Sequence, residues 1–132
     1  MSQKGEQAKA LFLEGYNCAQ AVFVVFAEDY GISREAALKL SSSFGGGFGR
    51  LREVCGAVCG MTMALGLAEG NTDPEGKLAH YEKVRALMSE FSERHGCYIC
   101  RDLIATGDHH ACAEFVYSAA EILEKYLAES QK

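Results

Sequence analysis

The sequence lacks the features that mark several large classes of protein. Its 13 Lys and Arg residues are outnumbered by 18 Asp and Glu residues, giving a net charge of -5, so the basic stripe of a nucleic-acid-binding surface is missing. No segment approaches the roughly 18 consecutive apolar residues of a membrane span. No apolar segment of the secretory type follows the first residues. We therefore expect a cytoplasmic protein that binds no nucleic acid and is not membrane-embedded.

Familiar catalytic motifs are missing as well. The chain contains no serine nucleophile motif, no His-Glu-x-x-His zinc motif and no pair of carboxylates spaced for acid–base catalysis. Residues 45–49 are rich in glycine, but they match neither the dinucleotide-binding nor the P-loop pattern. Anion binding by this segment would depend on Arg50 and backbone N–H groups, and the signal is weak. We interpret the segment as a flexible or tightly turned lead into the next helix.

The alternating pattern of β-strands is also absent, and the only proline, Pro74, lies in a polar loop. Apolar residues recur at helical spacing along almost the whole chain. Asn17, Ser33 and Asp108 are suitable N-cap residues for three of these helices, and Gly31 is suited to end the first of them. A helix of small apolar residues from 54 or 55 to about 67 is hydrophobic all round, so we expect it to be buried.

Two amphipathic helices complete the pattern. The long one stops near Gly96, and its predicted inward stripe comprises Leu78, Tyr81, Val84, Leu87, Met88 and Phe91. The inward stripe of the last helix comprises Phe115, Ala119, Ile122, Leu123 and Tyr126. A chain of 132 residues can bury a real hydrophobic core. The sequence therefore predicts a single all-α domain over residues 1–132, a compact bundle of about five to six helices.

What the sequence does contain is a set of thiols. The six cysteines are Cys18, Cys55, Cys59, Cys97, Cys100 and Cys112. The cytoplasm keeps ordinary thiols reduced, so a cysteine-rich chain there is more readily metal-binding or catalytic than stapled by disulfides. A lone cysteine is usually a small buried hydrophobe, and Cys18 taken by itself would be read in this way.

Cys55 and Cys59 are four residues apart and share one face of their helix. Gly56 and Gly60 have the same spacing and leave a groove beside them. The default interpretation is tight helix packing, and the alternative is room for a cofactor or a second sulfur. Cys55 lies near the helix start, where unsatisfied N–H groups and the helix dipole favour a thiolate. We expect Arg50 and Arg52 to add to this effect, partly offset by Glu53.

Cys97 and Cys100 form a Cys-x-x-Cys motif, which suits either two ligands of one metal ion or a disulfide. The βαβ surroundings of a thioredoxin-like protein are missing. His109 and His110 lie close to Cys112, but consecutive histidines on a helix cannot both face one site. At most one joins Cys112, and a solvated first turn is the more common outcome. The isolated histidines, His80 and His95, are expected on the surface.

Read in order, the chain contains Asn-Cys-Ala-Gln at 17–20, Phe-Gly-Gly-Gly at 44–47, Cys-Gly-Ala-Val-Cys-Gly at 55–60, Cys-Arg-Asp-Leu at 100–103 and a last cysteine at 112. From about Phe12 to Tyr126 this order resembles the C_GCAxxG_C_C family, whose members are described as redox-active. The resemblance implies four working cysteines: Cys18, Cys55, Cys100 and Cys112. Cys59 then occupies a variable position of the motif, and Cys97 lies outside it.

Two functions remain open at this point, and the third reading, a bundle with inert buried cysteines, ranks last. In the first, the four cysteines carry out thiol–disulfide exchange or electron transfer with a redox partner protein. Cys55 is then the attacking thiolate and Cys100 its resolving partner. In the second, the same four cysteines bind an iron–sulfur cluster, or a structural Zn²⁺ ion. Four cysteines allow three disulfide pairings, and a homodimer is an alternative to the monomer.

Overall fold

The computed structural model describes residues 2–106 and 111–131, and every regular element in this part of the chain is helical. Six helices have eight or more residues: α1 (Gln3–Leu13), α2 (Cys18–Ala27), α3 (Arg34–Ser41), α5 (Gly56–Glu69), α6 (Lys77–His95) and α8 (Ala111–Ser130). The shorter elements are η1 (Glu28–Tyr30), η2 (Ser42–Phe44), α4 (Gly45–Phe48), η3 (Pro74–Gly76), α7 (Cys100–Leu103) and η4 (Ile104–Thr106). The predicted all-α bundle is thus confirmed.

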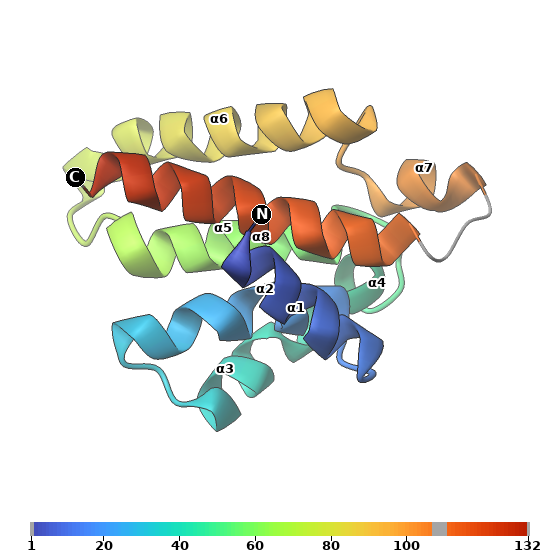
Figure 1. Ribbon diagram of the computed structural model, residues 1–132. Helices are drawn as coiled ribbons and strands as arrows, with labels where there is room; N and C mark the ends of the chain where they lie inside the picture. The colour runs from blue at the N-terminus through green and yellow to red at the C-terminus, as the bar shows by residue number, and fades with distance from the viewer. Residues whose placement is uncertain (1, 107–110, 132) are drawn as a thin grey trace.

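Helix α5 lies in the centre of the bundle, as its small apolar residues predict. It packs against α2 on one side and against α6 and α8 on the other, with α6 uppermost and α1, α2 and α3 below in Figure 1. Met61 and Leu65 of α5 are fully buried, together with Phe91 of α6 and Ile122 and Leu123 of α8. A helix that is apolar all round finds a stable place only where neighbours cover every face.

The helix boundaries follow the capping residues. The Asn17 side chain accepts a hydrogen bond from the Gln20 backbone N–H at 2.8 Å, and the Gln20 side chain accepts one from the Asn17 N–H at 3.1 Å. This reciprocal pair satisfies two donors at the start of α2. The Ser33 hydroxyl caps α3 by accepting a hydrogen bond from the Ala36 backbone N–H at 3.1 Å. Gly31, the expected end of α2, has φ +84° and instead ends η1, because α2 itself already ends at Ala27. Asp108 lies outside the described residues.

The predicted stripe of α6 is buried only in part. Leu87 and Phe91 are buried, whereas Leu78 and Tyr81 are 66% and 48% exposed. Packing against α5 and α8 therefore buries side chains of α6 toward its C-terminal end, while two apolar side chains of its first turns remain outside the core. The expectation that Leu78 and Tyr81 point inward is wrong because periodicity does not show how far a neighbouring helix extends.

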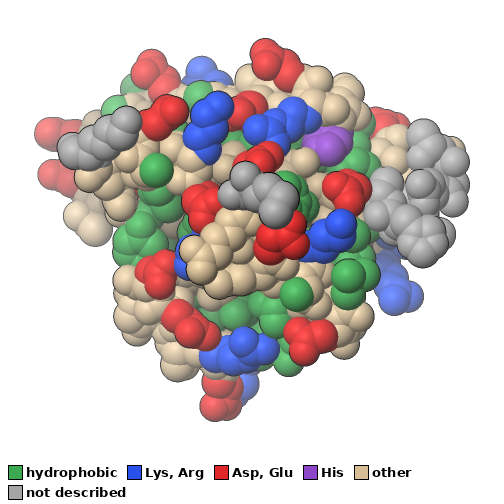
Figure 2. Space-filling model, viewed as in Figure 1, with side chains coloured by type: hydrophobic (Ala, Val, Ile, Leu, Met, Phe, Trp, Pro, Cys, Tyr) green, Lys and Arg blue, Asp and Glu red, His purple; other side chains and the backbone are tan. Residues whose placement is uncertain are grey.

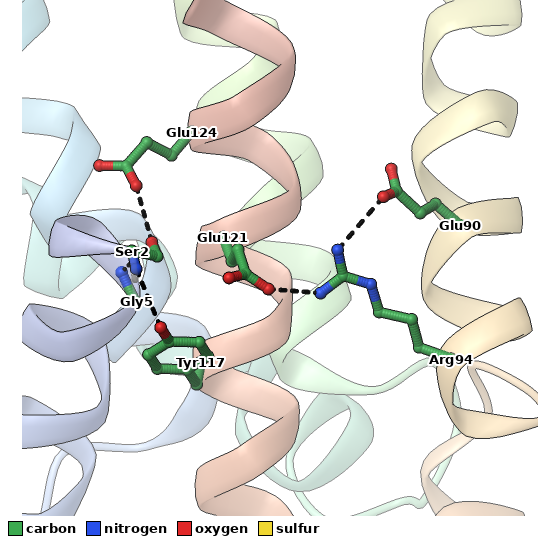
Figure 3. A network of polar contacts seen from close by, with 7 residues as sticks. All are labelled: Ser2, Gly5, Glu90, Arg94, Tyr117, Glu121 and Glu124. Atoms are coloured by element: carbon green, nitrogen blue, oxygen red, sulfur yellow. Dashed lines mark hydrogen bonds and ion pairs between the residues drawn. The ribbon is translucent and has the colours of Figure 1, made fainter.

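Polar contacts connect α8 to α1 and α6 (Figure 3). The Ser2 hydroxyl donates to Glu124 at 2.7 Å, and the Ser2 backbone N–H donates to the Tyr117 hydroxyl at 2.9 Å. On the other side of α8, Arg94 forms an ion pair with Glu121 at 2.7 Å. These contacts hold α1 and α6 against α8.

Acidic and basic side chains are interspersed over the face of the molecule shown in Figure 2, as the mixed composition with a small acidic excess suggests. Within the described ranges, none of the helices combines the length and the apolar character that crossing a membrane requires.

Candidate functional site

One open cavity of about 850 Å³ brings together four of the cysteines, Cys18, Cys55, Cys100 and Cys112. Each lies where a helix begins. Cys18 is the first residue of α2, Cys55 immediately precedes α5, Cys100 is the first residue of α7, and Cys112 lies in the first turn of α8. Four segments far apart in the sequence therefore meet with their N-terminal ends at one place.

A single antiparallel backbone bridge, Val54 to Ile99, brings Cys55 and Cys100 to this cavity. The Cys55 N–H donates to the Tyr98 carbonyl at 2.8 Å, and the Cys100 N–H donates to the Glu53 carbonyl at 2.6 Å. Alternate residues of extended backbone point to the same side, so Cys55 and Cys100 share the side opposite Val54 and Ile99.

Glycine lets Cys18 approach the start of α5. A Cβ atom built on Gly56 would overlap the Cys18 sulfur, so this sulfur occupies the space that a side chain would fill. One turn later, a Cβ on Gly60 would lie 2.7 Å from the Ala19 carbonyl oxygen and 3.0 Å from the Val22 Cβ. Both interpretations of the glycine groove are therefore correct: Gly56 accommodates a second sulfur, and Gly60 permits tight packing of α2.

The glycine-rich loop is a tight turn that forms part of the cavity wall. Gly46 and Gly47 have φ values of +67° and +74°, a region that side chains disfavour. Their carbonyls accept hydrogen bonds from the N–H groups of Arg52 and Glu53, both at 3.1 Å. A Cβ on Gly47 would lie 2.7 Å from the Glu53 nitrogen and 2.9 Å from the Cys100 Cβ. Through these contacts the glycine-rich loop packs against residues 50–53 and holds their backbone in position.

Three residues after these glycines have unusual backbone conformations. Phe48, Arg50 and Arg52 have φ values of +64°, +67° and +65°. Positive φ is uncommon for residues with side chains and persists where the surrounding structure enforces it. Arg50 and Arg52 both line the cavity, so the strained backbone carries two positive charges to the thiols. The glycine cluster was the sequence signal for this arrangement, and the sequence associated both arginines with Cys55, but it did not predict the contact of Arg52 with Cys100.

Arg52 contacts one of the thiols directly. Its guanidinium Nη1 lies 3.7 Å from the Cys100 sulfur in a donor geometry. A hydrogen bond from a cation stabilises an anionic sulfur more than a neutral one. Arg52 therefore places a cationic hydrogen-bond donor directly against the Cys100 sulfur.

Cys55 behaves differently from the sequence-based expectation. Its side chain is 5% exposed, and burial raises its pKa far above the usual range, with a further rise from the negative charge of Cys18. The N–H groups of Ala57 and Val58 at the helix start lower the pKa, as expected, but their effect is smaller than that of burial. The prediction of a thiolate favoured at Cys55 is therefore wrong, because desolvation exceeds the stabilisation by the helix N-terminus.

The pKa of Cys18 is linked to the charges of other thiols in this group. Burial raises its pKa, and a negative charge on Cys100 raises it further, whereas the Gly46 N–H lowers it. Cys18 also contributes to the raised pKa values of Cys55 and Cys59. Ionisation of one thiol in this group therefore opposes ionisation of its neighbours.

Cys59 and Cys97 lie outside the lining of the cavity. The Cys59 thiol lies 3.9 Å from the Val54 carbonyl oxygen, and burial raises its pKa to about 11. The Cys97 thiol lies 4.0 Å from the Ile99 carbonyl oxygen. The Cys-x-x-Cys pair is thus divided, with Cys100 in the cavity and Cys97 beside it. Cys18, Cys55, Cys59, Cys97 and Cys100 are present as thiols.

The histidines do not extend this group. His109 and His110 lie outside the described residues. His95, expected on the surface, instead packs its ring against Phe91 and Phe115, with centroids 4.7 and 4.8 Å away. Burial lowers the pKa of His95, and the neighbouring charge of Arg94 lowers it further. The pattern of polar and apolar residues in α6 could not predict that His95 is packed in this way, because the Phe115 ring belongs to α8.

The fit of a metal ion or cluster depends on how closely these side chains converge. In residues 2–106 and 111–131, no three His, Cys, Asp or Glu side chains are arranged so that they could hold one metal ion. The four cavity cysteines supply the right donor type for a cluster, but as arranged they surround a cavity and do not form a coordination site.

A family model described as "Putative redox-active protein (C_GCAxxG_C_C)" matches residues 16–126. The chain belongs to this family. The match includes all four cavity cysteines and the glycine-rich loop. No curated protein and no solved structure matches the chain. The family description places the thiols in redox chemistry and specifies no reaction.

Proposed function

We propose that this C_GCAxxG_C_C protein carries out thiol–disulfide exchange, with Cys100 as the attacking thiolate and Cys18 as the resolving thiol. The observation that carries the proposal is the hydrogen bond from Arg52 to the Cys100 sulfur at 3.7 Å. An attacking thiol must be ionised, and Cys100 is the cavity thiol to which a described cation donates. Cys55, the attacking group expected from the sequence, is replaced in this role because its pKa is raised by burial.

The reaction proceeds in two steps. The Cys100 thiolate attacks a substrate R–S–S–R′, the S–S bond breaks, a Cys100–S–S–R bond forms and R′–S⁻ leaves. Cys18 then gives its proton to solvent and attacks the Cys100 sulfur, which releases R–S⁻ and forms a Cys18–Cys100 disulfide. The substrate gains two electrons, the two protein thiols lose them, and both leaving thiolates take protons from solvent. A dithiol of a redox partner protein would reduce the disulfide again.

Electrostatic coupling orders these steps. Burial raises the pKa of Cys18, and the negative charge of Cys100 raises it further, so Cys18 stays protonated while Cys100 is a thiolate. Formation of the mixed disulfide removes that charge, and the pKa of Cys18 falls. Cys18 therefore becomes easier to ionise at the stage where it must attack. In this proposal Cys55 and Cys112 line the space around the reacting pair.

An iron–sulfur cluster is the second candidate, and one observation favours it: all four cysteines line one cavity. Such a cluster would be held by Cys18, Cys55, Cys100 and Cys112 and would supply one-electron transfer. Anaerobic purification followed by a visible spectrum and assays for iron, sulfide and zinc separates the two candidates. A brown protein containing iron and sulfide contradicts the exchange proposal. A colourless, metal-free protein that loses two thiols on oxidation contradicts the cluster.

A trapping experiment tests the assigned roles. After exposure to bis(2-hydroxyethyl) disulfide, Cys18→Ser should accumulate a mixed disulfide on Cys100, which intact-mass and peptide mass spectrometry detect. Cys100→Ser should accumulate none at this position, and Cys97→Ser should behave like the wild type. If Cys55→Ser abolishes the reaction and Cys100→Ser does not, the attacking residue is Cys55 and the proposed order is wrong.

A further inference from the structure

We propose that the cavity recognises low-molecular-weight disulfides that carry carboxylates, and that Arg50 binds one of these carboxylates. This inference rests on the proposed function for the turnover of the ligand, but the binding of the anion can be tested separately. Arg50 lines the same cavity as the four cysteines and is exposed to solvent. It is therefore within reach of a molecule that enters to meet Cys100.

The charge of Arg50 is unsatisfied in the described part of the chain. Two of the other arginines have carboxylate partners: Arg94 pairs with Glu121 at 2.7 Å, and Arg101 pairs with Glu53 at 3.6 Å. Arg50 forms no ion pair with a described carboxylate, and Arg52 donates to a sulfur. Two guanidinium groups thus line the cavity. In the proposed reaction the Cys100 thiolate offsets the charge of Arg52, so the charge of Arg50 remains to attract an anion.

The loop also holds Arg50 in place. Its backbone has φ +67°, and its N–H donates to the Gly45 carbonyl at 3.1 Å. A Cβ on Gly46 would lie 2.7 Å from the Arg50 Cγ and 3.7 Å from the Arg52 Nη1, so both side chains pass close to Gly46. The Gly46 N–H faces the Cys18 sulfur. Because Gly46 has no side chain, the Cγ of Arg50, the guanidinium of Arg52 and the Cys18 sulfur all lie close to it.

The chemistry of this arrangement selects the ligand. A guanidinium presents a planar fork of N–H donors that matches a carboxylate, often through two parallel hydrogen bonds. Pockets of roughly 300–1,000 Å³ accommodate small molecules, and this cavity has a volume of about 850 Å³. A disulfide with a carboxylate a few bonds from its sulfur can place the carboxylate at Arg50 and the sulfur at Cys100. Two cations near the thiols disfavour cationic disulfides in the same position.

Two substrates with the same reacting bond test the preference. The dianion 3,3′-dithiodipropionate and the neutral bis(2-hydroxyethyl) disulfide differ in charge and not in the S–S group. We expect the ratio of kcat/KM for the dianion to that for the neutral compound to fall about tenfold in Arg50→Gln, the effect of losing one charge-assisted hydrogen bond. Arg50→Lys should recover part of the ratio. Arg85, an exposed arginine of α6 outside the cavity, supplies the matched control, and Arg85→Gln should leave the ratio unchanged.

Binding of suberate tests the anion site without any redox step, since this dicarboxylate replaces the S–S group of dithiodipropionate by two methylenes. Isothermal titration should show binding by the wild type and by Arg85→Gln, and binding weakened about tenfold in Arg50→Gln. Turnover of neither disulfide together with Arg50-dependent suberate binding would contradict the proposed function and support this inference. Equal suberate binding by wild type and Arg50→Gln, or an equal loss in Arg85→Gln, would overturn the inference.

Discussion

The guanidinium Nη1 of Arg52 lies 3.7 Å from the sulfur of Cys100 and donates a hydrogen bond to it. This contact crosses two segments 48 residues apart in the sequence, and the backbone N–H of Arg101 strengthens the connection by donating to the Arg52 carbonyl at 3.2 Å. The cation and the thiol are therefore held together by the backbone as well as by their charges.

Replacing Arg52 by glutamine should slow alkylation of Cys100. The variant loses a charge-assisted hydrogen bond to the Cys100 sulfur, which stabilises an anionic sulfur more than a neutral one, and only the thiolate reacts with iodoacetamide. We expect the rate of Cys100 modification to fall about tenfold, equivalent to ~1.4 kcal/mol of lost stabilisation of the charged form. Peptide mass spectrometry after timed alkylation measures this rate. Arg85→Gln is the control, and an unchanged rate in Arg52→Gln would show that the contact does not activate the thiol.

The buried thiols should make the protein less stable at alkaline pH. Burial raises the pKa of Cys55, and it raises that of Cys59 to about 11. In the unfolded chain these thiols ionise above about pH 8.5. Between that pH and their folded pKa values the folded state binds more protons, so the free energy of unfolding falls as pH rises.

Urea unfolding at a series of pH values measures this dependence. Cys55→Ser should weaken it relative to the wild type, because serine does not ionise in this range. Cys97→Ser is the matched control, since Cys97 lies outside the cavity lining and is half-buried. An identical decline of stability in the wild type and in Cys55→Ser would contradict the assignment of a buried, neutral thiol.

Gly56 should be intolerant of a side chain because the Cys18 sulfur occupies its space. The Cβ of an alanine at this position would also lie 3.0 Å from the Phe44 carbonyl oxygen. Overpacking of this kind costs about 1–3 kcal/mol, and chemical denaturation of Gly56→Ala measures it. Combining Gly56→Ala with Cys18→Ala should recover part of the loss.

Gly66, in the same helix, provides the control. A Cβ on Gly66 would meet no heavy atom within 4 Å, so Gly66→Ala should stabilise α5 by roughly 0.5–1 kcal/mol through its lower backbone entropy in the unfolded chain. If both alanine variants change stability equally, close approach of Cys18 is not what requires glycine at position 56.

The helices could be predicted from the sequence because their signals are local. Asn17 and Ser33 cap helices through side-chain bonds to residues three positions later, and such bonds are encoded in neighbouring residues. The bridge between Val54 and Ile99 is different. It pairs residues 45 positions apart and involves too few residues to produce an alternating pattern.

The ionisation of the site residues was harder to predict than which residues form the site. The family resemblance selected four cysteines, and these are the four that line the cavity. The ionisation of Cys55 could not be derived in the same way, because the desolvation that raises its pKa comes from tertiary packing. The sequence associated Arg52 with Cys55, and its contact with Cys100 could not be predicted, since that contact and its positive φ both depend on the fold of the glycine loop.

His95 should make the protein less stable under acidic conditions. Burial lowers its pKa, and its Nε2 atom is buried without a hydrogen-bond partner among the described residues. The unfolded chain takes up a proton at His95 below about pH 6.5, whereas the folded state resists this protonation. The unfolded state therefore binds more protons as pH falls through this range, and the free energy of unfolding decreases.

His95→Phe should keep the aromatic contacts with Phe91 and Phe115, remove the unpaired nitrogen and flatten the acidic decline. Thermal denaturation at several pH values compares this variant with the wild type. A steeper or unchanged acidic decline in His95→Phe would mean that other groups cause the loss of stability.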